Sequence, residues 1–290
     1  MRKGKPIGLP YQGSKKKISK KIVEIIKQNF GTDKPIYDIF GGGGAITAEC
    51  LINGLEVYYN DLARTVTDMF QRVLSTDREF LKTLLVSRDE FFKIREKENK
   101  TVDDELKLLV NSFGNVRNTY LYSKEFSDLK YNLAIEIIKK HDTFSGYRKT
   151  DTYKNAYRPF DFGKESRAQV LQQLQRLQQL ERVQQLQNIN INRLEITNAD
   201  YKHFSYLKDM IIYLDPPYEN TIVEGYNIDT FYSQSVYDWA YEMSKKNIVL
   251  ISSYEISNNR FQCVYEFKKA RSTLAAQVYG GKTEKLFMVK

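Results

Sequence analysis

The residues best suited to chemistry are Asp215-Pro216-Pro217-Tyr218. A carboxylate, a main-chain carbonyl held still by a proline and an aromatic ring can together hold a planar base that carries an exocyclic amine. Asp215 and the Pro216 carbonyl can each accept one N–H of that amine, and Tyr218 can stack on the ring. A buried strand that ends in a proline turn with a surface tyrosine would look the same, so the neighbouring elements must decide between the two interpretations.

The element that positions this motif is the apolar run at residues 209–214. A run of this length and content predicts a buried, parallel strand. Two consecutive prolines cannot continue a hydrogen-bonded ladder, so the strand is expected to end before them. In open α/β sheets ligands bind at the carboxyl ends of the strands. Asp215 and Tyr218 are therefore expected at the ligand-binding edge of a sheet.

A second candidate site follows an earlier predicted strand, at residues 35–40. That strand runs into four glycines at 41–44 and then a predicted helix at 45–53, an arrangement that lets backbone approach a ligand closely. The next predicted strand ends at Asp61, 23 residues after Asp38. An acid at this point is placed to bind ribose hydroxyls. Together these elements indicate a cofactor that contains a nucleoside.

The glycine run lacks the Gly-x-Gly-x-x-Gly spacing of a dinucleotide site, and no Gly-Lys-Ser/Thr follows it. NAD and ATP are therefore disfavoured. S-adenosylmethionine has a nucleoside but no phosphate, so it needs the close approach and the acid but no anion site. Asp200 follows a further predicted strand and could accept a hydrogen bond from the cofactor adenine; the alternative is that it caps the next helix.

Strand and helix alternate at both ends of the 290-residue chain but not in the middle. This pattern predicts an α/β catalytic domain from residues 1–66 and 164–290, with a mainly helical insertion at 67–163. A low-complexity stretch at 169–187 has apolar residues every third position, which is too short a period for a coiled coil. We expect a helix that is buried on several sides and packed on the sheet.

The net charge of +9 favours a polyanionic partner, although solubility alone could explain it. In the insertion, bases are interleaved with aromatic and amide side chains. Lys and Arg can meet phosphates, and Asn and Arg can read base edges. The candidate DNA-binding residues are Asn115, Arg117, Asn118, Arg148, Lys149, Lys154 and Arg158. The alternative is a solvated loop over a small helical subdomain.

No stretch approaches 18 consecutive apolar residues, and the basic N-terminus has no apolar core after it, so neither a membrane span nor a signal peptide is expected. Two cysteines and two histidines do not favour a disulfide framework or a metal centre. A cytoplasmic location is expected on these grounds.

The glycine turn after the first strand, the acid ending the second and Asp-Pro-Pro-Tyr ending a later one resemble the Dam-type adenine-N6 DNA methyltransferases, the alpha group. The order of cofactor motif, target-recognition region and catalytic motif is also that of the family. Residues 11–15 look like the family's N-terminal cofactor motif, often Trp-Ala-Gly-Gly-Lys, with Ser14 at the second glycine. Phe40, Gly41 and Gly43 are matched to its Phe-x-Gly-x-Gly motif.

The resemblance implies a Rossmann-like S-adenosylmethionine-dependent methyltransferase fold with a mixed, mostly parallel sheet and a helical target-recognition insertion. It implies cofactor-binding roles for Tyr11, Gly13, Lys15, Asp38, Phe40, Gly41, Gly43, Asp61, Asp200 and Tyr201, and catalytic roles for Asp215, Pro216, Pro217 and Tyr218.

The implied reaction moves a methyl group from S-adenosylmethionine to the N6 amine of an adenine flipped out of a specific double-stranded DNA sequence. The protein is expected as a monomer or weak dimer, and a cognate restriction nuclease is a candidate partner. Cytosine-N4 methylation, methylation of RNA or of a protein amide, and a catalytically silent DNA-binding protein are the alternatives.

Overall fold

The computed structural model describes residues 7–11, 13–157, 174–219, 230–267 and 283–290. The chain divides into two compact units. A sheet-containing unit comprises Lys15–Thr67 and Asn190–Lys290, and a helical unit comprises Met1–Ser14 and Asp68–Ile189. The boundary at residue 67 falls inside helix α3 (Arg64–Leu74).

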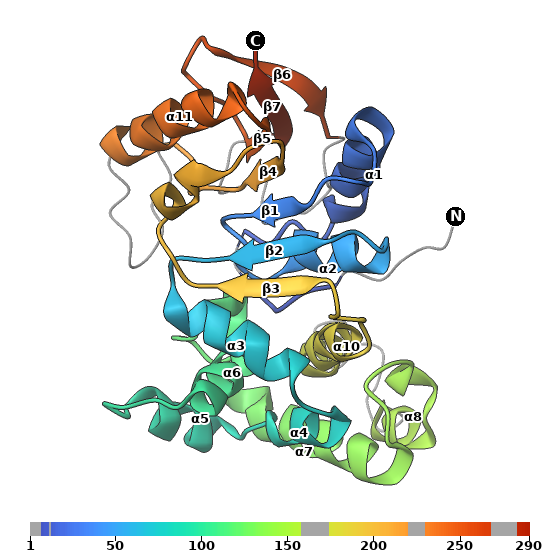
Figure 1. The fold of residues 1–290 in the computed structure, drawn as a ribbon. Coiled ribbons are helices and arrows are strands. Elements are labelled where there is room, and N and C mark those ends of the chain that lie inside the picture. Colours follow the sequence, from blue (N-terminus) through green and yellow to red (C-terminus); the bar gives the residue numbers. More distant parts are fainter. Residues whose placement is uncertain (1–6, 12, 158–173, 220–229, 268–282) are drawn as a thin grey trace. The chain divides into compact units, whose positions relative to one another are not determined.

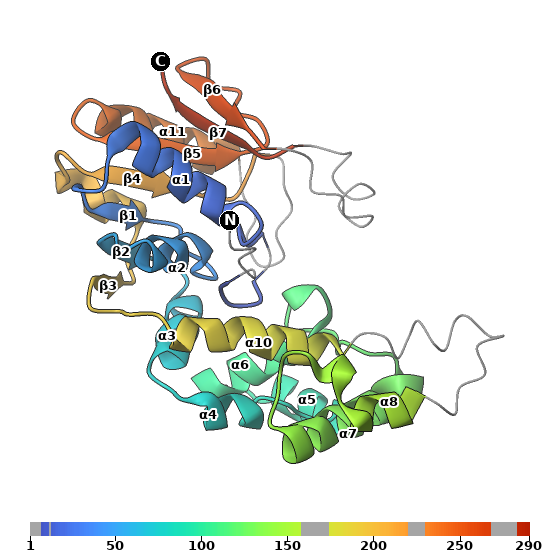
Figure 2. The ribbon, with the colours of Figure 1, turned by 90° about the vertical axis from the view of Figure 1, so that its right-hand side faces the viewer.

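The sheet-containing unit is built on seven strands in the order β3-β2-β1-β4-β5-β7-β6 (Figure 1). The strands are β1 (Ile36–Asp38), β2 (Val57–Asn60), β3 (Leu194–Thr197), β4 (Ile211–Leu214), β5 (Ile248–Ser253), β6 (Phe261–Glu266) and β7 (Lys285–Val289). Strands β1 to β5 pair in parallel, and β7 runs antiparallel to both β5 and β6. Figure 2 shows β7 and β6 at the edge of the sheet beyond β5. This confirms the predicted α/β class with a mixed, mostly parallel sheet.

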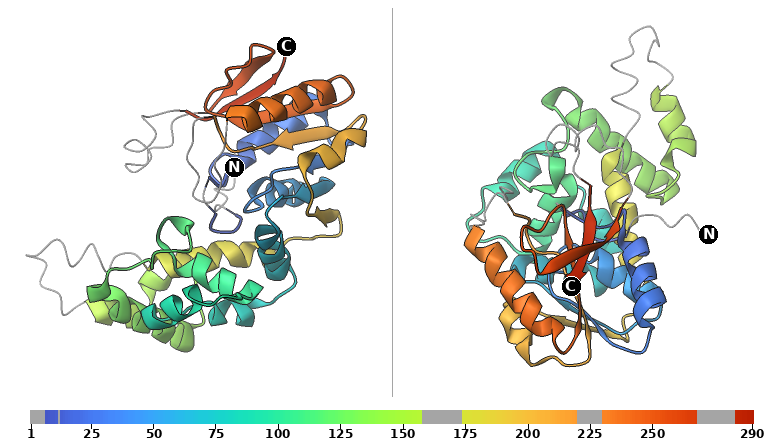
Figure 3. Two further views of the ribbon diagram at one scale, coloured as in Figure 1. Left: turned by 90° about the vertical axis from the view of Figure 1, so that its left-hand side faces the viewer. Right: turned by 90° about the horizontal axis from the view of Figure 1, so that it is seen from above.

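Helices cover both faces of this sheet, as a parallel sheet requires. The helices α1 (Ser19–Phe30) and α2 (Ala45–Ile52) pack against each other on one face, and α11 (Thr230–Ser244) lies on the other (Figure 3). The short helix η3 (Tyr201–Tyr206) joins β3 to β4. Helix α1 begins at Ser19, and no side chain caps its start.

Alternate residues of the central strands enter different cores. Ile212 and Leu214 of β4 belong to the core that includes Val236 and Ala240 of α11. Because side chains alternate along a strand, Tyr213 points to the opposite face, that of α1 and α2. The same alternation carries the Asp215 side chain to the α1–α2 face just beyond the end of β4.

The helical unit contains α4 (Arg78–Thr83), α5 (Arg88–Arg95), α6 (Val102–Asn111), η1 (Phe113–Asn115), α7 (Lys124–His141), η2 (Tyr147–Lys149), α8 (Asp151–Tyr157) and α10 (Gln175–Gln187). Three of its described helices begin at a capping side chain: Asp77 caps α4, Ser87 caps α5, and Thr101 forms a capping box with Asp104 at the start of α6. In one core of this unit Val86, Phe91 and Leu108 pack with Tyr120 and Tyr122.

Helix α10 changes the expected domain boundary. Its Leu177, Leu180, Val183 and Leu186 are all fully buried, in agreement with a helix covered on several sides. Within the helical unit α10 packs with α4 and α6. This unit extends to Ile189 and takes in the start of the chain, whereas the sequence placed the limits of the insertion at 67–163. A period of three predicts burial around a helix but not which neighbours bury it.

Among the described residues no helix is both long enough and apolar enough to cross a membrane.

Candidate active site

The two predicted motifs meet at one edge of the sheet because β1 and β4 are neighbours. Asp38 pairs with Tyr213, and the Ile39 N–H donates to the Tyr213 carbonyl at 3.2 Å. Beyond β1 lies the glycine turn, and beyond β4 lies Asp215. From β1 the chain continues to β2 on one side, whereas β4 leads to β5 on the other. This is the topological switch point at which open α/β sheets bind ligands.

Asp215 belongs to a cluster of four polar side chains, Lys15, Asp215, Tyr218 and Glu284, which we call the Asp215 cluster. The Lys15 ammonium lies 2.7 Å from the Asp215 carboxylate and 3.6 Å from that of Glu284. The Tyr218 hydroxyl lies 3.2 Å from Asp215 Oδ1 and 2.5 Å from Glu284 Oε1, and it accepts a hydrogen bond from Lys15. The Tyr218 ring packs edge-on against Tyr254, with ring centroids 4.7 Å apart.

Burial governs the protonation of this cluster. Burial raises the pKa of Asp215, and the charge of Lys15 only partly opposes it. Burial likewise raises the pKa of Glu284, again against the effect of Lys15. For Lys15, burial alone would lower the pKa, but the charges of Asp215 and Glu284 outweigh it and raise the pKa. Burial, together with the two carboxylates, lifts the pKa of Tyr218 well above its ordinary value, so its hydroxyl stays protonated.

The glycine turn is closed by its own hydrogen bonds. The Gly41 N–H donates to the Asn60 carbonyl at 2.7 Å, the Gly44 N–H donates to the Gly41 carbonyl at 2.8 Å, and the Gly42 N–H donates to Asp61 at 2.9 Å. Three amides of this turn are therefore already engaged. A phosphate site needs such amides free, so the turn suits a ligand that brings a nucleoside and no phosphate.

Backbone conformation requires glycine at some positions of the turn, and lack of space for a side chain requires it at another. Gly42 and Gly44 have φ of 49° and 70°, in the left-handed region. At Gly41 a Cβ would lie 2.3 Å from Cε2 of Tyr59, whose hydroxyl donates to the Gly42 carbonyl at 2.8 Å. Counted from Phe40, the glycines of Phe-x-Gly-x-Gly are Gly42 and Gly44 and not Gly41 and Gly43, so the motif match is corrected by one residue. The cofactor-binding roles of Gly41 and Gly43 stay predictions.

Asp38 is buried, and its carboxylate supports helix α2. Oδ2 accepts hydrogen bonds from the Thr47 N–H at 3.2 Å and from the Thr47 hydroxyl at 2.7 Å, in the first turn of α2. Burial raises the pKa of Asp38 to about 7, although both Thr47 bonds oppose the shift. A carboxyl oxygen accepts hydrogen bonds whether or not the group is protonated, so the two bonds from Thr47 let Asp38 hold the start of α2 behind the glycine turn.

Asp61 lies at the carboxyl end of β2. Its Oδ1 accepts from the Ala63 N–H at 2.8 Å, and its Oδ2 accepts from Gly42. Burial raises its pKa despite these two bonds. Each carboxylate oxygen has a further lone pair, so Asp61 can still accept from two hydroxyls of a ribose.

Asp200 and Tyr201 follow β3. The Asp200 side chain accepts from the Lys202 N–H at 2.9 Å and caps η3, which is the alternative that the sequence left open. Tyr201 is buried and stacks on Phe40, with ring centroids 6.1 Å apart and planes 29° apart. Trp239 of α11 packs edge-on against the same tyrosine. These aromatic residues form one side of the switch point.

Asn60, which the motifs did not single out, ties three strand ends together. Its Nδ2 donates to the Ile39 carbonyl at 3.0 Å and to the Ala199 carbonyl at 2.9 Å. Its Oδ1 accepts from the Ala199 N–H and from the Thr197 hydroxyl, both at 2.9 Å. A buried amide immediately before an acid at a strand end is the signal that could have revealed it. Glu284 is the second residue of the site that the motifs did not identify, and the sequence around it contains no signal that could have revealed it.

Other predicted site residues lie in the helical unit. Tyr11 and Gly13 belong to its first segment, where the Ser14 N–H donates to the Tyr11 carbonyl. Arg117 pairs with Glu105 at 2.7 Å, and Asn115 accepts from Gln179 at 3.2 Å, so both have structural partners. Asn118, Arg148, Lys149 and Lys154 are exposed, and Arg158 lies outside the described residues.

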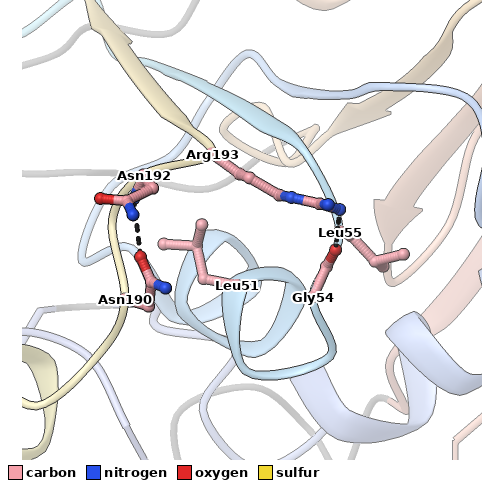
Figure 4. Close-up of a pocket in the computed structure, with 6 residues that line it drawn as sticks. All are labelled: Leu51, Gly54, Leu55, Asn190, Asn192 and Arg193. Carbon is pink, nitrogen blue, oxygen red and sulfur yellow. Dashed lines mark hydrogen bonds between the residues drawn. The ribbon is translucent and has the colours of Figure 1, made fainter.

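A small pocket of about 200 Å³ lies elsewhere in the sheet-containing unit (Figure 4). Its lining comes from residues 51–55 and 190–193, which precede β2 and β3. Arg193 closes one side by donating to the Gly54 carbonyl at 2.7 Å. The pocket is therefore at the amino ends of these strands, opposite the edge that carries Asp215.

Five parallel strands extended by an antiparallel pair, with a glycine turn after the first strand, define the Rossmann-like methyltransferase class of fold. The family described as D12 class N6 adenine-specific DNA methyltransferase matches residues 11–275, and the chain belongs to this family. The protein is thus an enzyme that methylates adenine in DNA, as the sequence resemblance implied. The family also sets aside the cytosine and non-DNA alternatives.

A search of curated proteins finds no match. Among solved structures, a "putative methylase" of Haemophilus influenzae is 9% identical, with 94% of this chain and 88% of that chain covered and a TM-score of 0.35. A "putative methyltransferase" of Escherichia coli is 10% identical, with 97% and 91% covered and the same TM-score.

Proposed function

We propose that the switch point between β1 and β4 is the catalytic centre, and that it binds S-adenosylmethionine beside a flipped-out adenine of double-stranded DNA. The observation that carries this proposal is the position of Asp215. Its carboxylate lies just beyond β4, in a buried cluster, next to the strand that leads into the glycine turn.

The described residues fit the cofactor. The turn at Gly41–Gly44 has no room for a side chain at Gly41, and its engaged amides disfavour a phosphate. Asp61 would hold the ribose hydroxyls, and Phe40 with Tyr201 offers an aromatic surface for the adenine moiety. When bound, the cofactor supplies a methyl group on a positively charged sulfur.

The catalytic residues hold the substrate amine. Asp215 and the Pro216 carbonyl accept its two N–H groups, which directs the nitrogen lone pair away from them. The Tyr218 ring stacks on the flipped base and replaces part of the stacking that the base had in the duplex, which is worth a few kcal/mol. Orientation of this kind contributes a large share of the acceleration, and the Asp215 charge stabilises the positive charge that develops on the nitrogen.

DNA binding is assigned to the exposed bases of the helical unit. Arg148 and Lys149 lie on the short helix η2, and Lys154 follows on α8. Such side chains meet phosphates and position the duplex without reading its sequence. Asn118, on the exposed segment after α6, is the candidate for base contact. A monomer or weak dimer, a cytoplasmic location and a partner restriction nuclease remain predictions.

The test is incubation of the purified protein with radiolabelled S-adenosylmethionine and DNA from a host that lacks adenine methylation. Label should enter that DNA as N6-methyladenine, and DNA already methylated by the same enzyme should accept none. Label in 4-methylcytosine, or no label in any DNA while the cofactor binds, would overturn the proposal.

A further inference from the structure

We propose that Glu284 is a positioning residue for methyl transfer: it shares the positive charge of Lys15, so that Lys15 does not fully neutralise the Asp215 carboxylate that meets the substrate amine. This inference rests on the proposed function of Asp215. It adds to that function a second carboxylate that does not touch the substrate.

Lys15 is paired with two carboxylates. Its ammonium lies 2.7 Å from Asp215 and 3.6 Å from Glu284, and its side chain is only 7% exposed. If Lys15 and Asp215 stood alone, their charges would cancel, and the pair would present little negative potential to an incoming amine. With Glu284 present, one cation faces two carboxylates, so the Asp215 cluster keeps a net charge of about −1 when both are ionised.

The charge matters at one point of the reaction. The N6 lone pair of adenine forms the new N–C bond while the C–S bond of the donor breaks and its electrons stay on sulfur. Positive charge thereby moves onto N6, and one N6 proton is then released to water. A carboxylate that is fully neutralised by lysine cannot stabilise that charge well, whereas one whose lysine is shared with Glu284 can.

Glu284 is well placed for this role because the sheet holds its backbone. It comes directly before β7, where Lys285 pairs with Ser253 of β5. The Phe267 N–H donates to the Glu284 carbonyl at 2.9 Å. The carboxylate therefore projects from a rigid strand end, and its side chain is only 16% exposed.

Glu284 also connects to the substrate-stacking residue. The Tyr218 hydroxyl is 2.5 Å from Glu284 and 3.2 Å from Asp215, so Glu284 is the nearer acceptor of its proton. Asp215 then has to share its lone pairs only between Lys15 and the substrate amine. The contact to Glu284 also fixes the Tyr218 ring, which Tyr254 supports from the side.

The test compares Glu284→Gln, Glu284→Asp, Lys15→Met and the double variant Lys15→Met/Glu284→Gln in single-turnover methylation of DNA. Glu284→Gln should slow the chemical step about 10-fold to 100-fold with little change in the KM for DNA. In the Lys15→Met background the same change should cost less than about threefold, because the cation that Glu284 shares has been removed. Glu284→Asp should recover part of the rate. The matched control is Glu255→Gln, since Glu255 is an exposed acid that pairs with Lys285.

A second readout does not depend on turnover. With 2-aminopurine at the target adenine of a duplex and no cofactor, Glu284→Gln should alter the fluorescence of the flipped base, because the Tyr218 ring loses its anchor. Equal rate losses in both Lys15 backgrounds, or wild-type rates for a folded Glu284→Gln, would overturn this inference. Full activity of Asp215→Asn would instead overturn the proposed function itself.

Discussion

The ammonium of Lys15 lies 2.7 Å from the carboxylate of Asp215, inside the sheet-containing unit. The residue proposed to hold the substrate amine is therefore paired with a cation before any substrate arrives. An adenine amine must share Asp215 with that lysine. The charge of Asp215 in the Asp-Pro-Pro-Tyr motif therefore depends on two residues that are distant in sequence, Lys15 and Glu284.

Gly41→Ala tests the closeness of the glycine turn to Tyr59. The new methyl group would lie 2.3 Å from the Tyr59 ring, which is fully buried and cannot move aside. We expect a loss of about 1–3 kcal/mol in the free energy of unfolding, together with weaker binding of S-adenosylmethionine. Urea denaturation and equilibrium dialysis measure the two effects.

The control for Gly41→Ala is Tyr59→Phe, which keeps the ring and removes only its hydrogen bond to the Gly42 carbonyl. It should cost about 1 kcal/mol and leave cofactor affinity nearly unchanged. A Gly41→Ala protein as stable as wild type would show that the turn is not packed as the structure has it.

Asp38 should make stability depend on pH. Burial raises the pKa of the Asp38 carboxyl to about 7 in the folded protein, whereas in the unfolded chain the pKa is near the ordinary value of 3.8. Between these values the folded state binds a proton that the unfolded state has released, so stability falls as pH rises from about 4 to 7. Asp38→Asn should make this decline shallower by up to about 1 kcal/mol per pH unit.

Urea denaturation at several pH values from 4 to 8 measures that decline. Some pH dependence should remain in Asp38→Asn, because burial also raises the pKa values of Asp61, Asp215 and Glu284. An identical slope for the variant and the wild type would contradict a protonated Asp38 in the folded state.

Asn60→Ala tests the residue that joins the strand ends. The change leaves the Ile39 carbonyl and both polar groups of Ala199 without their buried partner. Each such loss costs about 1–3 kcal/mol, so we expect a clear fall in Tm by differential scanning calorimetry. Asn192→Ala, at an exposed position before β3, should shift Tm little. Equal Tm values for both variants would exclude the proposed tie.

Much of the sheet could be predicted from the sequence, because its elements have local signals. The buried run before Asp215 and the strand–glycine–helix unit at residues 36–52 appear as predicted, within a few residues. The family then connects them to one reaction. Such local patterns suffice where a motif and the element that presents it are adjacent in sequence.

The rest depended on contacts between distant segments. Glu284 reaches Tyr218 only through the pairing of β7 with β5, which no local pattern specifies. Asn60 looks like any strand-end amide until β3 is in register beside it. The leucine spacing of α10 likewise does not specify that α4 and α6 are its partners.

The exposed bases of η2 are expected to neutralise DNA phosphates, and such contacts make the affinity for DNA depend on salt concentration. Arg148→Ala/Lys149→Ala should weaken binding to any sequence and reduce the slope of log K against log salt by about 0.9 for each phosphate that the protein no longer neutralises. Fluorescence anisotropy over a range of salt concentrations measures this slope. Lys245→Ala, an exposed base of the other unit that pairs with Glu242, is the matched control. An unchanged slope in the double variant would remove these two residues from the interface.

The central claim is that Asp215 holds an adenine amine for methylation. Its most direct test is single-molecule sequencing of DNA from a host that lacks its own adenine methylation and expresses either the wild type or Asp215→Asn. Asp209→Asn serves as the control, because Asp209 is 82% exposed and pairs with Lys34 away from the cluster. We expect N6-methyladenine in one sequence context with the wild type and the control, and none with a folded Asp215→Asn that still binds S-adenosylmethionine. N6-methyladenine at wild-type levels with Asp215→Asn would contradict it.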